Sequence, residues 1–176
     1  ESDRDELERD VVERLTSMED IVVSDVLLDE EQSRITLQRV PNDPGVAASI
    51  FSAVAEGGIL VDMIVQNDPD VDGAGTAVAS LSFTVTRRDL EPALLLARAC
   101  LEQWPGSSVE CERDIAMLSV VGIGLRSHTS VGERMFRALA EQSINIQMIN
   151  TSEIRISAVV MAEKGEAGHR CLADAF

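Results

Sequence analysis

Hydrophobic and polar residues follow two alternating periods along this chain, one of two residues and one of three to four residues. The first period is typical of strands that bury one face, and the second of helices that bury one stripe. The acidic segment 29–33 is predicted to be a turn. The pattern predicts strands over residues 21–28, 34–40, 60–66, 77–86, 109–113, 116–123, 144–151 and 154–161, and helices over 5–18, 45–56, 90–103, 130–141 and 166–175.

These elements occur twice in the order β-α-β-β-α, which lacks one strand of the ferredoxin-like β-α-β-β-α-β unit. The strand at 109–113 can complete the first sheet, whereas the second unit ends in a helix. A surplus strand lies at 21–28. We therefore predict an α+β fold in which this N-terminal strand completes the second sheet, so that the first unit is inserted within the second. The expected domains are 30–113 for the first, 18–29 with 114–176 for the second, and an N-terminal helical linker at 1–17.

The two units also match position by position. Core-facing matches at a spacing of 85 residues are Phe51 with Phe136, Ala55 with Ala140, Ile59 with Ile144, and Met63 with Met148. Before the first helix of each unit the better spacing is 83 residues, which pairs Ile35 with Leu118 and Val40 with Ile123. The loop before the second helix is therefore two residues longer. A repeated scaffold with a changed loop keeps its core while its sites diverge.

The charge and hydropathy of the chain argue against two classes of binding partner, nucleic acids and membranes. Fifteen basic and 31 acidic residues give a formal net charge of −16, which repels phosphate backbones and anionic lipids. No apolar run approaches the ~20 residues that span a bilayer, and the N-terminus is acidic, unlike a signal peptide. We expect a cytoplasmic protein with no nucleic-acid or membrane partner.

Residues with catalytic or metal-binding chemistry are few. Cys100, Cys111 and Cys171 are widely spaced and form no C-x-x-C pair, so we expect small buried or half-buried hydrophobes and neither a disulfide nor a zinc site. His128 and His169 stand in no catalytic pattern. We expect no catalytic residue, no metal and no cofactor in this chain.

Two short motifs only weakly favour other kinds of binding site, one for calcium and one for a dinucleotide. The loop 68–73, DPDVDG, has the first carboxylates and the glycine of an EF-hand, but Ala79 stands where a bidentate Glu is needed and strands flank the loop. We interpret it as a solvated acidic turn. Gly122 and Gly124 follow a strand, but Ser127 occupies the third glycine position of a dinucleotide fingerprint.

Two long stretches resemble a known family. RITLQRVPNDPGVAASIFSAVAEGGILVDMIVQN, residues 34–67, resembles the first ACT domain of aspartate kinases, and MLSVVGIGLRSHTSVGERMFRALAEQSINIQMINTSEIRISAVV, residues 117–160, resembles the second. The ending LADAF is also similar to the family's C-terminus. The kinase half is missing, so the chain resembles a separate regulatory β subunit or an excised regulatory region.

The resemblance implies a function and a partner. Tandem ACT domains of this family bind end-product amino acids, threonine above all and lysine in many members, and thereby inhibit the phosphorylation of aspartate. Two regulatory chains pair as a homodimer and act on a kinase catalytic domain or α subunit. The effector pocket would combine Asn42, Asp43, Pro44, Gly45, Val46, Ala47 and Gln66 of one chain with Asn145 and Ile146 of the other.

The residues support such a pocket on physical grounds. Asp43 is well placed as a helix N-cap and Pro44 at the first helical position. Gly45 allows close approach, so that free N–H groups of the helix can meet an effector carboxylate. Gln66 and Asn145 carry amide oxygens for its ammonium.

Two departures from the family pattern concern the loops. Asn42 stands where many members have Asp, which replaces a charge-assisted bond with a neutral one and predicts weaker binding unless Asp43 substitutes. Thr129 and Ser130 replace the usual Pro-Gly, and Ser130 with Glu133 forms a predicted capping box. We expect the second loop to be structural. Two alternatives stay open: an ACT-type module that senses an amino acid for another enzyme, and a purely structural dimerisation module.

Overall fold

The computed structural model describes residues 23–67, 70–71, 75–125 and 129–176. The expected helix at 5–18 and the linker at 1–17 lie outside these residues, as do His128 and most of the acidic loop 68–73. None of the helices among the described residues is long and apolar enough to cross a membrane.

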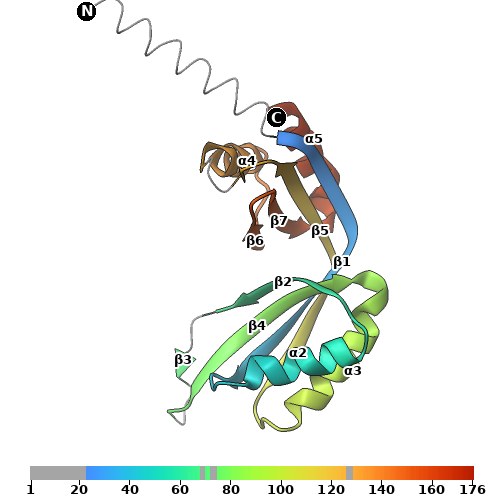
Figure 1. The fold of residues 1–176 in the computed structure, drawn as a ribbon, viewed down its shortest axis with the longest axis vertical. Coiled ribbons are helices and arrows are strands. Elements are labelled where there is room, and N and C mark those ends of the chain that lie inside the picture. Colours follow the sequence, from blue (N-terminus) through green and yellow to red (C-terminus); the bar gives the residue numbers. More distant parts are fainter. Residues whose placement is uncertain (1–22, 68–69, 72–74, 126–128) are drawn as a thin grey trace, which may run out of the picture. The chain divides into compact units, whose positions relative to one another are not determined.

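The chain divides into two compact units, which are drawn in Figure 1. We call Glu30–Ile115 the inserted unit, and we call Ala116–Phe176 together with the described residues before Glu30 the split unit. Each has its own hydrophobic core.

The inserted unit is a complete β-α-β-β-α-β unit. Its sheet has the order β2-β4-β1-β5, and the short strand β3 pairs with β4. Both β1 and β2 pair antiparallel with β4. Helices α2 and α3 lie side by side against this sheet (Figure 1). The elements are β1 (Val23–Pro41), α2 (Val46–Glu56), β2 (Val61–Gln66), β3 (Asp70–Val71), β4 (Ala77–Thr86), a 3-10 turn (Arg87–Asp89), α3 (Leu90–Leu101) and β5 (Ser108–Gly122).

The split unit takes its outer strand from the N-terminal part of β1. Its strands follow the order β1-β5-β7-β6, and the Ser24 hydroxyl donates to the Val121 carbonyl of β5 at 3.1 Å. The prediction that an N-terminal strand completes the second sheet is therefore confirmed, and with it the α+β fold. The other elements are α4 (Thr129–Glu141), β6 (Met148–Thr151), β7 (Arg155–Met161), a 3-10 turn (Ala162–Lys164) and α5 (Gly165–Ala175).

The predicted turn at 29–33 is wrong, because β1 continues through it as one strand. Gln32 and Ser33 are buried, Gln32 lies opposite Thr86 of β4, and the Ser33 hydroxyl donates to the Arg113 carbonyl of β5 at 3.0 Å. Polar composition suggested a turn, but flanking strands hold these residues extended. The sequence also predicted two separate strands at 109–113 and 116–123. This is wrong, because β5 runs through residues 114 and 115 as one strand.

The repeated residues confirm most of the duplication. Ile59 and Ile144 are buried in their respective cores. Phe51 packs edge-to-face on Phe83 at 5.5 Å between ring centroids, and its counterpart Phe136 packs against the core of the split unit. Another expected core pair is wrong, since Ala55 and Ala140 are both exposed. Val40 is also buried, whereas its counterpart Ile123 is 81% exposed after the end of β5.

The cysteines differ in exposure. Cys100 is buried and Cys171 half-buried, as expected, but Cys111 on β5 is exposed, so its expected burial is wrong. Burial raises the pKa of the Cys100 thiol. Burial and, to a smaller extent, the Asp174 charge raise the pKa of the Cys171 thiol.

We expect alkylation by iodoacetamide at mildly alkaline pH to modify Cys111 first and Cys100 last. The thiolate is the nucleophile, and a buried thiol with a raised pKa supplies little of it. Mass spectrometry of peptides from a time course would give the order, with urea-unfolded protein as the control in which the three rates converge. Equal rates in the native protein would contradict the assignment of exposure.

Gly168 of α5 packs closely on the core of the split unit. A Cβ atom there would lie 2.4 Å from Leu118 Cδ1, and Leu118 is fully buried. We expect Gly168→Ala to lower the free energy of unfolding by about 1–3 kcal/mol through overpacking. Gly132→Ala on α4, whose added Cβ meets nothing closer than 3.8 Å, should instead gain about 0.5–1 kcal/mol of helix stability. Urea unfolding would measure both, and equal stability of the two variants would contradict this packing.

Candidate functional site

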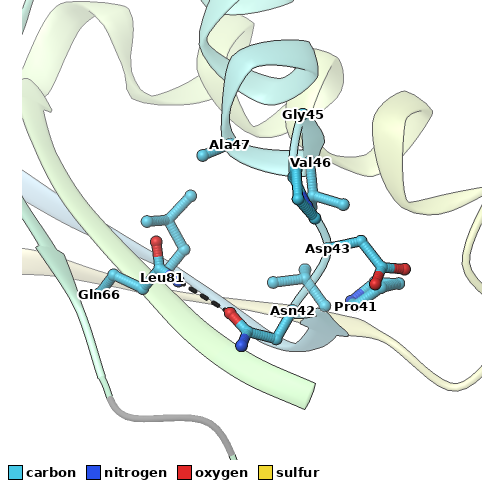
Figure 2. Close-up of a pocket in the computed structure, with 10 residues that line it drawn as sticks. Pro41, Asn42, Asp43, Gly45, Val46, Ala47, Gln66 and Leu81 are labelled. Atoms are coloured by element: carbon cyan, nitrogen blue, oxygen red, sulfur yellow. Dashed lines mark hydrogen bonds between the residues drawn. The ribbon is translucent and has the colours of Figure 1, made fainter. Parts of the chain in front are cut away.

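A cavity of about 360 Å³ opens in the inserted unit where β1 ends and α2 begins (Figure 2). The end of β1, the following turn and the first residues of α2 form one side, and β2 and β4 supply the other. The lining residues are Val40, Pro41, Asn42, Asp43, Pro44, Gly45, Val46, Ala47, Gln66 and Leu81.

Two amides form the polar part of this cavity. Gln66 Nε2 donates to Asn42 Oδ1 at 3.2 Å, which is the dashed line in Figure 2. Asn42 is held in place by its own N–H, which donates to the Ala77 carbonyl at 3.0 Å. Both side chains are exposed, so the Gln66 carbonyl and the Asn42 amide N–H groups remain available to a ligand.

The helix start differs from the prediction. The N-cap of α2 is Gly45, not Asp43, and Gly45 adopts the left-handed conformation with φ 97° and ψ −16°. The Asp43 carbonyl accepts from the Val46 N–H at 3.3 Å, which closes a turn before the helix. The predicted N-cap at Asp43 and first helical position at Pro44 are therefore wrong. A glycine reverses the chain direction here at little conformational cost.

This start leaves donors free at the cavity. Within the described part of the chain, no side chain caps α2, and the backbone N–H groups of Gly45 and Ala47 have no protein acceptor. A helix N-terminus carries about half a positive charge from the aligned peptide dipoles. The cavity therefore offers a place for a carboxylate, which these N–H groups can bind.

The distribution of charged side chains around the cavity also favours binding of a carboxylate by backbone N–H groups. No Lys or Arg lines the cavity, so an anion there must be bound by N–H groups. The Asp43 carboxylate points away from Gln66 in Figure 2. The amide oxygens of Asn42 and Gln66 can accept from an ammonium, and Val40, Leu81 and Ala47 provide apolar contacts. Such a set suits a small zwitterion.

The predicted site residues fall into two groups. The seven residues from the first ACT-like stretch, Asn42, Asp43, Pro44, Gly45, Val46, Ala47 and Gln66, line this one cavity. Asn145 and Ile146 belong to the split unit and lie just before β6. Asn145 is exposed, and Ile146 packs against the core of that unit.

Sequence reasoning missed Val40, Pro41 and Leu81 among the lining residues. Leu81 lies on β4 opposite Gln66 of β2. The sequence predicted a strand over 77–86, but only the register of β4 against β2 places Leu81 beside Gln66.

The second loop also differs from the prediction. Helix α4 begins at Thr129, so Ser130 lies inside the helix, and the carboxylate of Glu133 pairs with Arg137 one turn later. The predicted capping box of Ser130 and Glu133 is therefore wrong. The i, i+4 spacing of Glu133 and Arg137 explains the alternative pairing.

Comparisons with known proteins cover nearly the whole chain. The ACT domain family matches residues 38–98 and 118–176. The aspartate kinase Ask_LysC of Stutzerimonas stutzeri (strain A1501) is 38% identical over 160 residues, which are 91% of this chain and 38% of that protein. The chain thus spans under two fifths of this kinase's length.

Solved structures of aspartate kinase regulatory subunits are also similar to this chain. The ligand-free regulatory subunit of aspartate kinase from Thermus thermophilus is 40% identical, with a TM-score of 0.80 over 88% of this chain and 99% of that one. A structure of aspartokinase alpha and beta subunits contains a chain that is 40% identical, with a TM-score of 0.77 over 88% of this chain and 98% of that one.

The left-handed Gly45 predicts a stability effect. We expect Gly45→Ala to lower the free energy of unfolding by about 1–2 kcal/mol, because a Cβ atom strains this conformation although nothing lies within 4 Å of it. Gly45→Asn should lose less, since Asn tolerates the left-handed region. Gly58 follows the same helix at φ 71° and lies outside the cavity. Gly58→Ala is therefore the matched control, because it strains a left-handed glycine without touching the cavity. Urea unfolding would measure the free energy of unfolding of these variants. A wild-type value for Gly45→Ala would contradict the left-handed conformation of Gly45.

Proposed function

The chain belongs to the aspartate kinase family, as a regulatory part built from two ACT domains, and from this membership we propose that it senses an end-product amino acid for feedback inhibition of an aspartate kinase. The observation that carries the proposal is the cavity at the start of α2, where uncapped N–H groups face two amide side chains. The two ACT domains support a regulatory role. The groups that line the cavity support a small zwitterion as the ligand.

We propose threonine as the effector, because the family resemblance implies it and because its polar groups match the groups that line the cavity. Its carboxylate would accept from the N–H groups of Gly45 and Ala47, and its ammonium would donate to Gln66 Oε1. Its hydroxyl would bond to Asn42 and its methyl group would contact Leu81. A cavity of about 360 Å³ has room for such a ligand. Lysine is the second effector to test, alone and together with threonine.

A second copy of the chain completes the pocket in this proposal. Asn145 and Ile146 of that copy would cover the bound effector, which links ligand binding to homodimer formation. Asn145 is exposed before β6 and is free to make such a contact. Closing a pocket with a second chain removes water and strengthens each hydrogen bond inside it.

The effector would act on the kinase by stabilising one arrangement of the dimer. A kinase catalytic domain or α subunit bound to the regulatory chains would favour a different arrangement in its active state. Coupling of this kind is typically about 1–3 kcal/mol and must be reciprocal for binding. A similar structure that contains both aspartokinase alpha and beta subunits supports a separate catalytic partner.

Binding of threonine to variants tests the pocket. We expect Gln66→Ala and Asn145→Ala each to weaken threonine binding about tenfold, since each removes a hydrogen bond to a charged group. Gln142→Ala, an exposed amide at the end of α4, is the matched control with wild-type affinity. Isothermal titration calorimetry of the purified chain gives the affinities, and urea unfolding shows that the variants are folded.

Other outcomes would favour the alternatives. Unchanged threonine affinity in both variants would remove this pocket assignment. Heat with a different amino acid only would indicate an ACT module of another enzyme, and no heat with any amino acid would indicate a structural dimerisation module.

A further inference from the structure

The inserted unit contains another cavity, which no part of the proposed function uses. Its volume is about 270 Å³, and we call it the Trp104 cavity after a residue in its wall. The last residues of β1, the start of β4 and the loop between α3 and β5 form its walls. Among the described residues, only Pro41 lines both this cavity and the one at the start of α2, so the two are neighbours with different linings.

The charged groups of the Trp104 cavity are unbalanced. Arg39 is the only charged residue among the described residues that line it. In the same unit, Arg34, Arg87 and Arg113 each pair with a carboxylate, whereas no described carboxylate pairs with the Arg39 guanidinium. In a chain with a net charge of −16, such a cation is available to an anionic ligand.

The backbone of Arg39 has a conformation that is unusual for a residue with a long side chain. Its φ is 53°, in the left-handed region, and it lies where the pairing of β1 with β4 shifts between Leu37 and Val40. The Ser107 hydroxyl donates to the Arg39 carbonyl at 2.8 Å and holds this bend. A glycine would adopt the conformation without strain. Strain of this kind is concentrated at functional sites, which favours a role for the Arg39 side chain.

Trp104 gives the cavity an apolar wall. It is the only Trp of the chain, and it is half-buried and packs against the core of the inserted unit. Its N–H donates to the Leu101 carbonyl at 2.9 Å, and its carbonyl accepts from the Ser107 N–H at 3.1 Å. Val78 and Pro105 add hydrocarbon to the lining. The cavity therefore combines one cation with apolar surface that the fold holds in place.

We propose that the Trp104 cavity binds a small monocarboxylate that has an apolar body and no ammonium group. The carboxylate binds the Arg39 guanidinium, whose planar fork of N–H groups matches its two oxygens. The apolar body packs on Trp104 and Val78, where its burial adds to the affinity. An amino acid binds less well, because no carboxylate among the described lining residues can accept from its ammonium.

Three ligands that share a branched chain test the proposal on the whole 176-residue chain. They are isovalerate, its uncharged amide isovaleramide, and valine, which adds an ammonium group to isovalerate. Fluorescence of the single Trp reports binding in this cavity, and isothermal titration calorimetry gives the affinity. We expect isovalerate to bind at millimolar concentration and to change the fluorescence. Isovaleramide and valine should change it only at concentrations at least about tenfold higher.

Substitutions of arginine separate the role of the charge from an effect on folding. Arg39→Asn removes the guanidinium, and Asn tolerates the left-handed region. It should weaken isovalerate binding about tenfold and leave the urea unfolding midpoint at or above the wild-type value. Arg98→Asn is the matched control with wild-type affinity, because it removes an exposed guanidinium of α3 outside the cavity.

Several results would overturn the proposal. They are absence of isovalerate binding to the wild-type chain at millimolar concentration, equal binding of isovaleramide, and wild-type affinity of Arg39→Asn. Ala47→Leu narrows only the cavity at the start of α2, so it should weaken threonine binding and leave isovalerate binding unchanged. Loss of isovalerate binding in Ala47→Leu would also overturn the proposal. Threonine binding that ignores Ala47→Leu would instead count against the proposed function and leave the carboxylate site standing.

Discussion

The fold depends on the need of β5 for a hydrogen-bonding neighbour, because a strand with unpaired N–H and C=O groups is an exposed edge. Among the described residues, the split unit follows the order β-α-β-β-α from β5 to α5, and the last element is a helix. The N-terminal part of β1 fills it, with Ser24 bonded to Val121. Farther along, β1 also borders β5 in the inserted unit, where Ser33 bonds to Arg113. The two continuous strands β1 and β5 thus contribute to both units, and the split unit is made of two separate stretches of sequence on either side of the inserted unit.

The cores of the two units stayed similar while residues at loops and strand ends diverged. Ile59 and Ile144 remain buried, and Phe51 and Phe136 each pack on their own core. Core positions tolerate little change in volume because interiors are close-packed. Loop and strand-end positions have no such restriction. Gln66 could therefore become Thr151, and Ala47 could become Gly132, without loss of either fold.

Periodicity was sufficient for the order of elements, because it is a local signal, and the family resemblance implied most of the residues of one cavity. Sequence reasoning failed where tertiary neighbours decide the local structure. Residues 29–33 have the composition of a turn, but β4 and β5 hold them in a strand. Asp43 has the composition of an N-cap, but the left-handed Gly45 moves the helix start two residues on. The place of Leu81 in the cavity required the register of β4 against β2.

The cavity at the start of α2 offers one physical way to hold the head group of an amino acid. Backbone N–H groups at the helix start lie on one side of it, and the amides of Asn42 and Gln66 lie on the other. These groups are fixed by the fold and carry no net charge, so salt screens them less than it screens an exposed ion pair such as that of Glu133 with Arg137. In the proposed function, selection among amino acids would therefore depend on hydrogen bonds and on the size of the cavity, because no Lys or Arg among the described residues lines it.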